Sequence, residues 1–162
     1  VKADFGIVVD PDVDRLAFVD ENGEMFGEEY TLVSCADYVL THSPGNTVSN
    51  LSSTKALADV TTSRGGMYFT SAVGELNVVE KMKAKNAVIG GEGNGGIIYP
   101  ELHYGRDALV GIALFLSFLK FIETRRRLFW TTELIDNPLF KYESPCPKAI
   151  KPPLFANFEV SH

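Results

Sequence analysis

The sequence predicts an α/β fold, a mixed, largely parallel sheet with flanking helices, preceded by a strand-loop-strand unit. Short runs rich in valine and isoleucine alternate with longer segments whose apolar residues have helical spacing. Such alternation is typical of parallel sheets in which helices join the strands. The 162 residues are 45% hydrophobic and 22% charged, which is the composition of an ordinary globular protein.

Two short strands are predicted within the first 25 residues. Phe5 to Val9 forms a continuous apolar run, which is typical of a buried strand. Leu16 to Val19 is a second strand, separated from the first by an aspartate-rich loop. The pair Asn22-Gly23 then indicates a tight turn. We therefore expect residues 1–25 to form a strand-loop-strand unit.

Residues 26–122 are predicted to form the α/β domain. The segment from Glu75 to Asn86 is the clearest amphipathic helix, with Leu76, Val79 and Met82 expected on its apolar face. The other expected elements are helices over 30–41, 53–63 (capped by Ser53-Thr54) and 107–124, and strands over 47–51, 67–70, 87–89 and 97–99.

Residues 123–162 show neither a helical nor a strand period. Four of the eight prolines fall between Pro145 and Pro153, so we expect an irregular, divergent tail with a short helix at 132–135. The run Arg125 to Arg127 is more typical of a solvated helix end than of a binding patch.

Charge and hydropathy argue against several classes of function. The net charge of −6 does not favour a nucleic-acid partner. The longest apolar stretch, residues 108–121, is interrupted by Ser117 and Lys120 and is shorter than the roughly 20 apolar residues that a membrane span needs. Cys35 and Cys146 fit no metal-site spacing, and no signal pattern is visible, so a reducing, cytoplasmic location is expected.

Three aspartates follow the first strand at alternate positions. In an extended loop, Asp10, Asp12 and Asp14 would project to the same side. Their like charges repel unless a cation lies among them, and carboxylate oxygens are ligands that suit Mg²⁺. Arg15 follows directly, and its planar guanidinium suits a phosphate. The sequence therefore predicts a magnesium site beside a phosphate.

Other readings of this loop remain open at this point. An EF-hand loop would also use the three aspartates and would place Glu21 at its twelfth position, but Arg15 stands where that motif needs glycine. A haloacid-dehalogenase-type phosphatase also places two aspartates after a strand, but it needs threonine or valine at the position of Asp14. A turn of solvated aspartates without any ion is the third alternative.

A glycine-rich loop, Gly90 to Gly96, follows the strand over 87–89. It carries two polar side chains, Glu92 and Asn94, among five glycines. A carboxylate beside an amide can bind sugar hydroxyls, because one accepts hydrogen bonds and the other both donates and accepts. The loop lies at the carboxyl end of a strand, where α/β proteins bind ligands. A tight glycine turn without a ligand is the alternative.

Together the two loops resemble those of the α-D-phosphohexomutase family, which includes phosphoglucomutase, phosphomannomutase and phosphoglucosamine mutase. The resemblance rests on DPDVDR after the first strand and on GGEGNGG followed by IIYPELHYGRDALVGIALFL, and it covers roughly residues 2–119. Within the family, serine often takes the place of Asn94 and histidine that of Gly96. The chain resembles the end of the second family domain, to about Met25, joined to the third domain.

The resemblance implies an isomerase that interconverts sugar 1- and 6-phosphates through a phosphoserine and a bisphosphate intermediate. By this resemblance Asp10, Asp12 and Asp14 hold Mg²⁺, and Arg15 is a catalytic residue that steadies the phosphate. The implied sugar-binding residues are Glu92, Asn94, Ser71 and Gly74, with His103 and Arg106 as further residues near the site.

The resemblance also implies partners. These are a phosphorylated hexose (glucose, mannose or glucosamine phosphate) and the remaining domains of a parent mutase, with neither nucleic acid nor membrane. The family's phosphoserine motif and its last phosphate-binding loop do not occur in the 162 residues, so the chain alone is expected to be inactive. The long helix from Asp107 is apolar nearly all round, which favours a buried helix or oligomerisation through exposed apolar surface.

Overall fold

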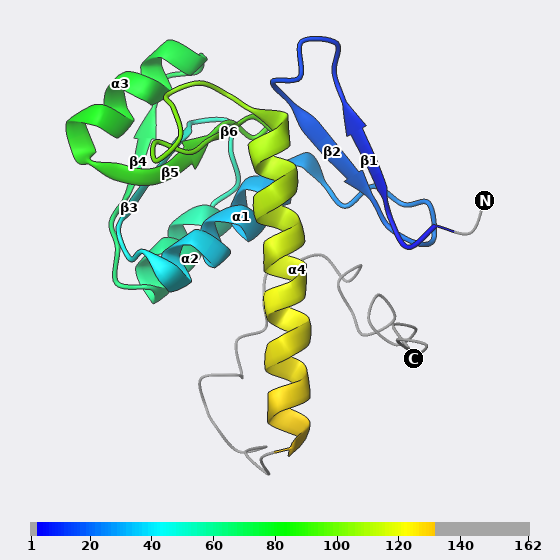
Figure 1. Ribbon diagram of the computed structural model, residues 1–162. Coiled ribbons are helices and arrows are strands. Elements are labelled where there is room, and N and C mark those ends of the chain that lie inside the picture. The colour runs from blue at the N-terminus through cyan, green and yellow to red at the C-terminus, as the bar shows by residue number, and fades with distance from the viewer. Residues whose placement is uncertain (1–2, 132–162) are drawn as a thin grey trace.

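A computed structural model of the protein describes residues 3–131, and the side chains of residues 3–123. The chain begins with an antiparallel hairpin of strands β1 (Gly6–Val9) and β2 (Leu16–Val19), in which Gly6 lies opposite Val19. These bounds confirm the predicted strand-loop-strand unit. The hairpin lies beside the long helix at the right of Figure 1.

A four-stranded sheet forms the centre of the rest of the described chain, in the order β4-β3-β5-β6. Its strands are β3 (Asn46–Asn50), β4 (Tyr68–Ser71), β5 (Ala87–Gly91) and β6 (Ile97–Ile98). Strand β3 pairs in parallel with both β4 and β5, whereas β6 turns back and pairs antiparallel with β5. The predicted mixed, largely parallel sheet is therefore confirmed.

Within residues 3–131, four helices cover the two faces of this sheet (Figure 1). They are α1 (Glu28–His42), α2 (Ala56–Ser63), α3 (Glu75–Lys85) and α4 (Ala108–Thr131). One buried cluster joins α1, α2 and α4 to Ile89 and Ile97, and a second joins α3 to Val48 and Ile98. Adjacent strand residues point to opposite faces, so Ile97 and Ile98 contribute to different clusters.

The hairpin shares the first of these clusters. The ring of Phe18 stacks on that of Phe115 in α4, with centroids 3.9 Å apart. Leu16 is buried against Gly111 of the same helix, and a side chain at Gly111 would collide with it. The strand-loop-strand unit is therefore held against the α/β unit by common apolar packing, which fixes the loop between β1 and β2 relative to the sheet.

Two predictions about burial were wrong. Strand β1 is exposed, not buried, because β2 pairs with one of its edges and no second layer covers it among the described residues; Val8 is 55% exposed. In α3 the buried face consists of Val78, Val79 and Met82, whereas Leu76 is 70% exposed. The face that meets β3 and β5 is thus rotated from the one that the 76/79/82 spacing indicated.

Helix starts also differ in detail from the prediction. Helix α2 begins at Ala56, later than predicted, and Lys55 before it already has helical dihedral angles. Thr54 Oγ1 accepts the N–H of Ala56 at 3.3 Å, so the capping contact comes from Thr54 and not from Ser53. Asp107 does precede α4 as predicted, and its carboxylate accepts the N–H of Val110 at 3.0 Å. The helix predicted over 132–135 lies outside the described residues.

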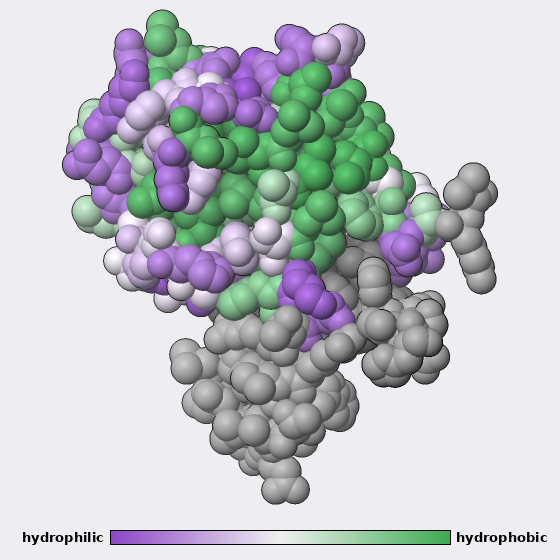
Figure 2. Space-filling view, in the orientation of Figure 1, coloured by the Kyte–Doolittle hydropathy of each residue, from purple (hydrophilic) through white to green (hydrophobic). Residues whose placement is uncertain are grey.

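Apolar side chains gather on one face of the molecule. Figure 2 shows this surface over the hairpin and the adjoining part of α4. The exposed apolar residues of these elements are Ile7, Val8, Val9, Leu109 and Leu116. Within residues 3–131, no helix combines the length and the apolar character needed to cross a membrane.

Candidate active site

The loop between β1 and β2 folds as a tight turn around the carboxylate of Asp10. Asp10 Oδ1 accepts the backbone N–H groups of Asp14 and Arg15, each at 3.1 Å, and the N–H of Val13 donates to the Asp10 carbonyl at 3.0 Å. Val13 adopts a left-handed φ of 59°, which is rare for a β-branched residue. The expectation of an extended loop is therefore wrong, and a turn brings the aspartates together instead.

The turn gathers three carboxylates at one point. Asp10, Asp12 and Asp14 each offer an oxygen atom, and these atoms lie within 4.8 Å of one another. Asp14 Oδ1 is buried and accepts no hydrogen bond, although Arg15 Nε lies 3.4 Å from it as an ion pair. Hard oxygen ligands with one unsatisfied buried oxygen fit a magnesium ion, which binds few protein ligands and keeps positions for water and phosphate.

The carboxylates of this loop differ in their affinity for protons. Desolvation raises the pKa of Asp14, and its contact with Asp10 adds to this effect, while Arg106 opposes it. Desolvation alone would raise the pKa of Asp10 as well. Hydrogen bonds from Arg15 and Asp14 outweigh this effect and lower the pKa of Asp10 to about 2. Burial and the neighbouring carboxylate thus leave Asp14, more than Asp10, in need of a nearby cation.

The N-terminus of α4 is joined directly to this loop. The N–H of Ala108, in the first turn of the helix, donates to the carbonyl of Val13 at 3.0 Å. The first N–H groups of a helix have no partners within it and carry partial positive charge. The hydrogen bond therefore satisfies one of them and directs the positive end of α4 toward the acidic loop.

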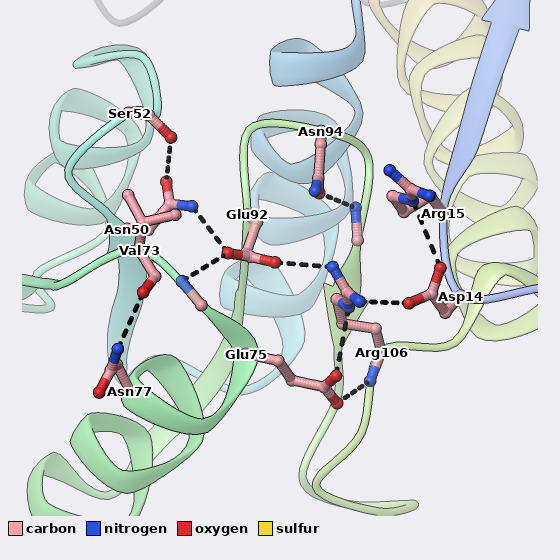
Figure 3. A network of polar contacts seen from close by, with 12 residues as sticks. Asp14, Arg15, Asn50, Ser52, Val73, Glu75, Asn77, Glu92, Asn94 and Arg106 are labelled. Atoms are coloured by element: carbon pink, nitrogen blue, oxygen red, sulfur yellow. Dashed lines mark hydrogen bonds and ion pairs between the residues drawn. The ribbon is translucent and has the colours of Figure 1, made fainter.

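Arg106 connects this loop to the glycine-rich loop. Its Nη2 is ion-paired with Asp14 Oδ2, and its Nη1 donates to Glu92 Oε2 at 2.7 Å (Figure 3). Glu75, at the start of α3, accepts the backbone N–H of Arg106 at 3.0 Å and lies 3.3 Å from its Nε. One half-buried guanidinium therefore lies among carboxylates from three separate segments.

Glu92 is almost fully buried, with 3% exposure. Its Oε1 accepts the side-chain amide of Asn50 at 2.9 Å and the backbone N–H of Gly74 at 3.1 Å, while Oε2 faces Arg106. Gly74 has a φ of 113° and precedes α3. Arg106 thus joins two of the predicted site residues, Asp14 and Glu92 (Figure 3), and Glu92 in turn accepts the N–H of a third, Gly74.

The other predicted residues lie around this network. Asn94 is turned back onto its own loop, where its Oδ1 accepts the N–H of Gly96 at 3.2 Å. Arg15 is half exposed and pairs with Asp10 at 2.8 Å. Ser71 is bonded to the carbonyl of Ala72 and lines a separate cavity of about 470 Å³ beside α3. His103 is exposed and pairs with Asp107 at 3.0 Å.

Sequence reasoning missed Asn50 and Glu75. Asn50 ends β3 and is 3% exposed; its Oδ1 accepts the hydroxyls of Ser52 and Ser53 at 2.9 and 2.8 Å. A polar residue at the carboxyl end of a central parallel strand is the signal that would have indicated it. Glu75 resembles an ordinary acidic residue of a first helical turn, so the sequence holds no signal for its contact with Arg106.

Comparison with known proteins gives a consistent result. Residues 27–133 match a family model described as phosphoglucomutase/phosphomannomutase, alpha/beta/alpha domain III. A phosphoglucomutase/phosphomannomutase of Thermococcus kodakarensis is 34% identical over 135 residues, which are 83% of this chain and 28% of the relative. A probable phosphoglucosamine mutase of Methanopyrus kandleri is 31% identical, covering 93% of this chain and 33% of the relative.

Solved structures show the same likeness. The putative phosphomannomutase of Thermus thermophilus superimposes with a TM-score of 0.67 at 29% identity, over 71% of this chain and 26% of that one. A phosphoglucomutase/phosphomannomutase family protein of Burkholderia thailandensis gives a TM-score of 0.65 at 27% identity, over 73% of this chain and 27% of that one. The chain spans about a third of the length of the curated relatives quoted above.

Proposed function

The chain belongs to the phosphoglucomutase/phosphomannomutase family, whose domain III it contains, and on this premise we propose that it supplies the metal loop and the sugar loop of a phosphohexomutase. We define the metal loop as Asp10 to Arg15 and the sugar loop as Gly90 to Gly96. The observation that carries the proposal is the bridge from Asp14 through Arg106 to Glu92, which joins the two loops at one site.

In the proposed site, Asp10, Asp12 and Asp14 hold Mg²⁺, for which the oxygen-only ligand set is suited. The ion supplies compensation for phosphate charge when it is bound. Arg15 is half exposed next to these carboxylates, and its remaining N–H groups contact the transferred phosphate. Neutralising phosphate charge at this point lowers the barrier to phosphoryl transfer.

Glu92, Asn94 and Gly74 form the proposed sugar side of the site, with Ser71 at its edge in the cavity beside α3. Glu92 already accepts three donors, and a carboxylate has about four acceptor positions, which leaves one for a sugar hydroxyl. The amide of Asn94 still has its two N–H donors for a second hydroxyl. An acceptor next to a donor is what two neighbouring sugar hydroxyls require.

The interconversion of sugar 1- and 6-phosphates belongs to the same proposal, as do the other domains of a parent mutase. We propose a domain boundary near residue 26, after the hairpin, with the exposed strand β1 as the surface on which further protein packs. A chain without the phosphate-carrying serine should not catalyse the interconversion. The EF-hand alternative is disfavoured, because strands and not helices flank the metal loop.

The proposal is tested by NMR titration of the 162-residue chain with glucose 1-phosphate, mannose 1-phosphate and glucosamine 1-phosphate in the presence of Mg²⁺. We expect the amide signals of the metal loop and the sugar loop to shift together, and Glu92→Gln to weaken binding by roughly 10- to 100-fold, as loss of a hydrogen bond to a charged group implies. The buried carboxylate of Asp20 lies outside the site, so Asp20→Asn is the matched control. Shifts confined to one loop, or equal weakening by both variants, would refute the joint site.

A further inference from the structure

Arg106 occupies a position that no other cation of the described residues shares. Its side chain is 19% exposed and pairs with Asp14 of the metal loop, with Glu92 of the sugar loop and with Glu75 of α3. Its aliphatic part lies on Gly96, where an added Cβ would stand only 2.5 Å from Arg106 Cδ. Neighbouring residues therefore fix both the guanidinium group and the aliphatic part of this side chain.

We propose that Arg106 is a positioning residue that holds the metal loop and the sugar loop together before any ion binds. The inference rests on the proposed function, because it assigns a purpose to the spacing of the two loops. It does not make Arg106 a catalytic residue, since the guanidinium acts through the carboxylates it holds.

The first argument is electrostatic. Three carboxylates whose oxygens lie within 4.8 Å of one another repel, and this repulsion tends to open the turn when no ion is bound. Arg15 offsets part of it from the exposed side of Asp10. Arg106 offsets it from the side of Asp14, whose side chain is only 19% exposed.

The second argument is that Arg106 and an ion do not compete for the same oxygen. Asp14 pairs with Arg106 through Oδ2, whereas its Oδ1 is buried and has no hydrogen-bond partner. A metal ligand whose second oxygen is held by a neighbouring group keeps its orientation. Arg106 can therefore remain in place when Oδ1 binds an ion. Arg15, whose Nε lies 3.4 Å from Asp14 Oδ1 and 2.8 Å from Asp10 Oδ2, is the side chain that must move aside.

The third argument concerns the sugar loop. Glu92 uses Oε2 for Arg106 and Oε1 for Asn50 and Gly74, so its carboxylate is fixed from both sides. Removing Arg106 would leave a buried carboxylate without its cation, which is strongly unfavourable. The loss should therefore loosen the sugar loop as well as the metal loop.

Hydrogen exchange of backbone amides in the 162-residue chain tests the proposal. The reporters are the N–H of Ala108 (bonded to Val13), of Arg15 (bonded to Asp10) and of Gly74 (bonded to Glu92). Without metal, Arg106→Gln should lower protection at all three by at least about tenfold relative to the amides of β3. Arg106→Lys keeps the charge but not the planar fork, so its loss should be smaller.

The matched control is Arg64→Gln. Arg64, at the end of α2, pairs with Asp37 of α1 at 2.6 Å, and its side chain is 29% exposed against 19% for Arg106. This variant should leave the three reporters unchanged. If Arg106→Gln does not fold, protection of the three reporter amides is compared between Arg106→Lys and Arg64→Lys instead.

Adding Mg²⁺ separates the inference from the proposed function. We expect the ion to restore protection at Ala108 and Arg15 in Arg106→Gln, but not at Gly74, which the ion does not contact. A local loss without rescue by Mg²⁺ would support the role of Arg106 and refute the metal assignment. No loss, or an equal loss across the reporters and β3, would overturn the positioning role.

Discussion

The carbonyl oxygen of Val13 accepts the backbone N–H of Ala108 at 3.0 Å, although Val13 has a φ of 59°. A β-branched residue reaches this conformation only when its surroundings enforce it, at an energetic cost of about 1–2 kcal/mol. The first turn of α4 provides that constraint, and the turn around Asp10 provides the rest. Strain in the metal loop is therefore balanced by contacts that hold the loop against the α/β unit.

This strain predicts that Val13→Asn stabilises the protein. Asparagine tolerates the left-handed conformation, and Val13 is exposed enough to lose little packing. The free energy of unfolding, measured by urea denaturation, should rise by roughly 0.5–1 kcal/mol. The control is Val9→Asn, at a similarly exposed position in β1 with ordinary strand geometry, which should lower it. A decrease for Val13→Asn would show that the left-handed backbone is not strained.

Gly96 and Arg106 should be energetically coupled. A Cβ at position 96 would stand 2.5 Å from Arg106 Cδ, so Gly96→Ala should lower the free energy of unfolding by about 1–3 kcal/mol. In the Arg106→Ala background the space is vacant, and the same substitution should have an effect smaller by at least about 1 kcal/mol. A double-mutant cycle measures this difference. Additive effects of the two substitutions would mean that the side chains do not share this space.

The hydrogen bonds of Asp20 predict that the free energy of unfolding decreases in acid. Its Oδ1 accepts the backbone N–H of Glu24 at 2.8 Å and of Asn22 at 2.9 Å, and these bonds, Glu24 first, lower its pKa in the folded state. Because the folded pKa lies below the unfolded value of about 3.9, the stabilisation is complete above that pH and is lost as pH falls through the folded pKa.

The corresponding experiment compares the parent with Asp20→Asn. At pH 7 the variant should be less stable by about 1–2 kcal/mol, and the difference between the two unfolding free energies should shrink steadily as the pH falls below about 3.9. Asp4→Asn, at an exposed position, should follow the parent at every pH. A difference that stayed constant between pH 7 and pH 2 would contradict the assignment.

Much of the fold was predictable because the local signals agree with the tertiary structure. The runs that became β2 and β5 are apolar where they meet helices, and the turn at Asn22-Gly23 occurs with a left-handed Gly23. Burial was less predictable. Strand β1 is as apolar as a core strand, yet only β2 pairs with it among the described residues, and sequence pattern does not reveal what covers a strand.

The candidate site was predictable in its residues but not in its connections. The aspartate spacing and the glycine-rich loop indicated two sites of chemistry, and Asp14 and Glu92 do lie at either end of one network. The bridge could not be predicted, because Arg106 reaches Asp14 through the packing of the hairpin against α4. Asn50 and Glu75 join the network for the same reason, since sheet order and helix placement set their contacts.

The central claim is that the metal loop binds a hard divalent ion that faces the sugar loop. Paramagnetic relaxation by Mn²⁺ is the most direct test of this claim. In the parent chain, Mn²⁺ should broaden the amide signals of Asp10 to Arg15 most and those of Gly90 to Gly96 next, and excess Mg²⁺ should reverse the effect. Asp12→Asn removes an exposed carboxylate of the cluster and should weaken the broadening by at least about tenfold in Mn²⁺ concentration. Equal broadening in parent and variant, or broadening of the metal loop alone, would contradict the account.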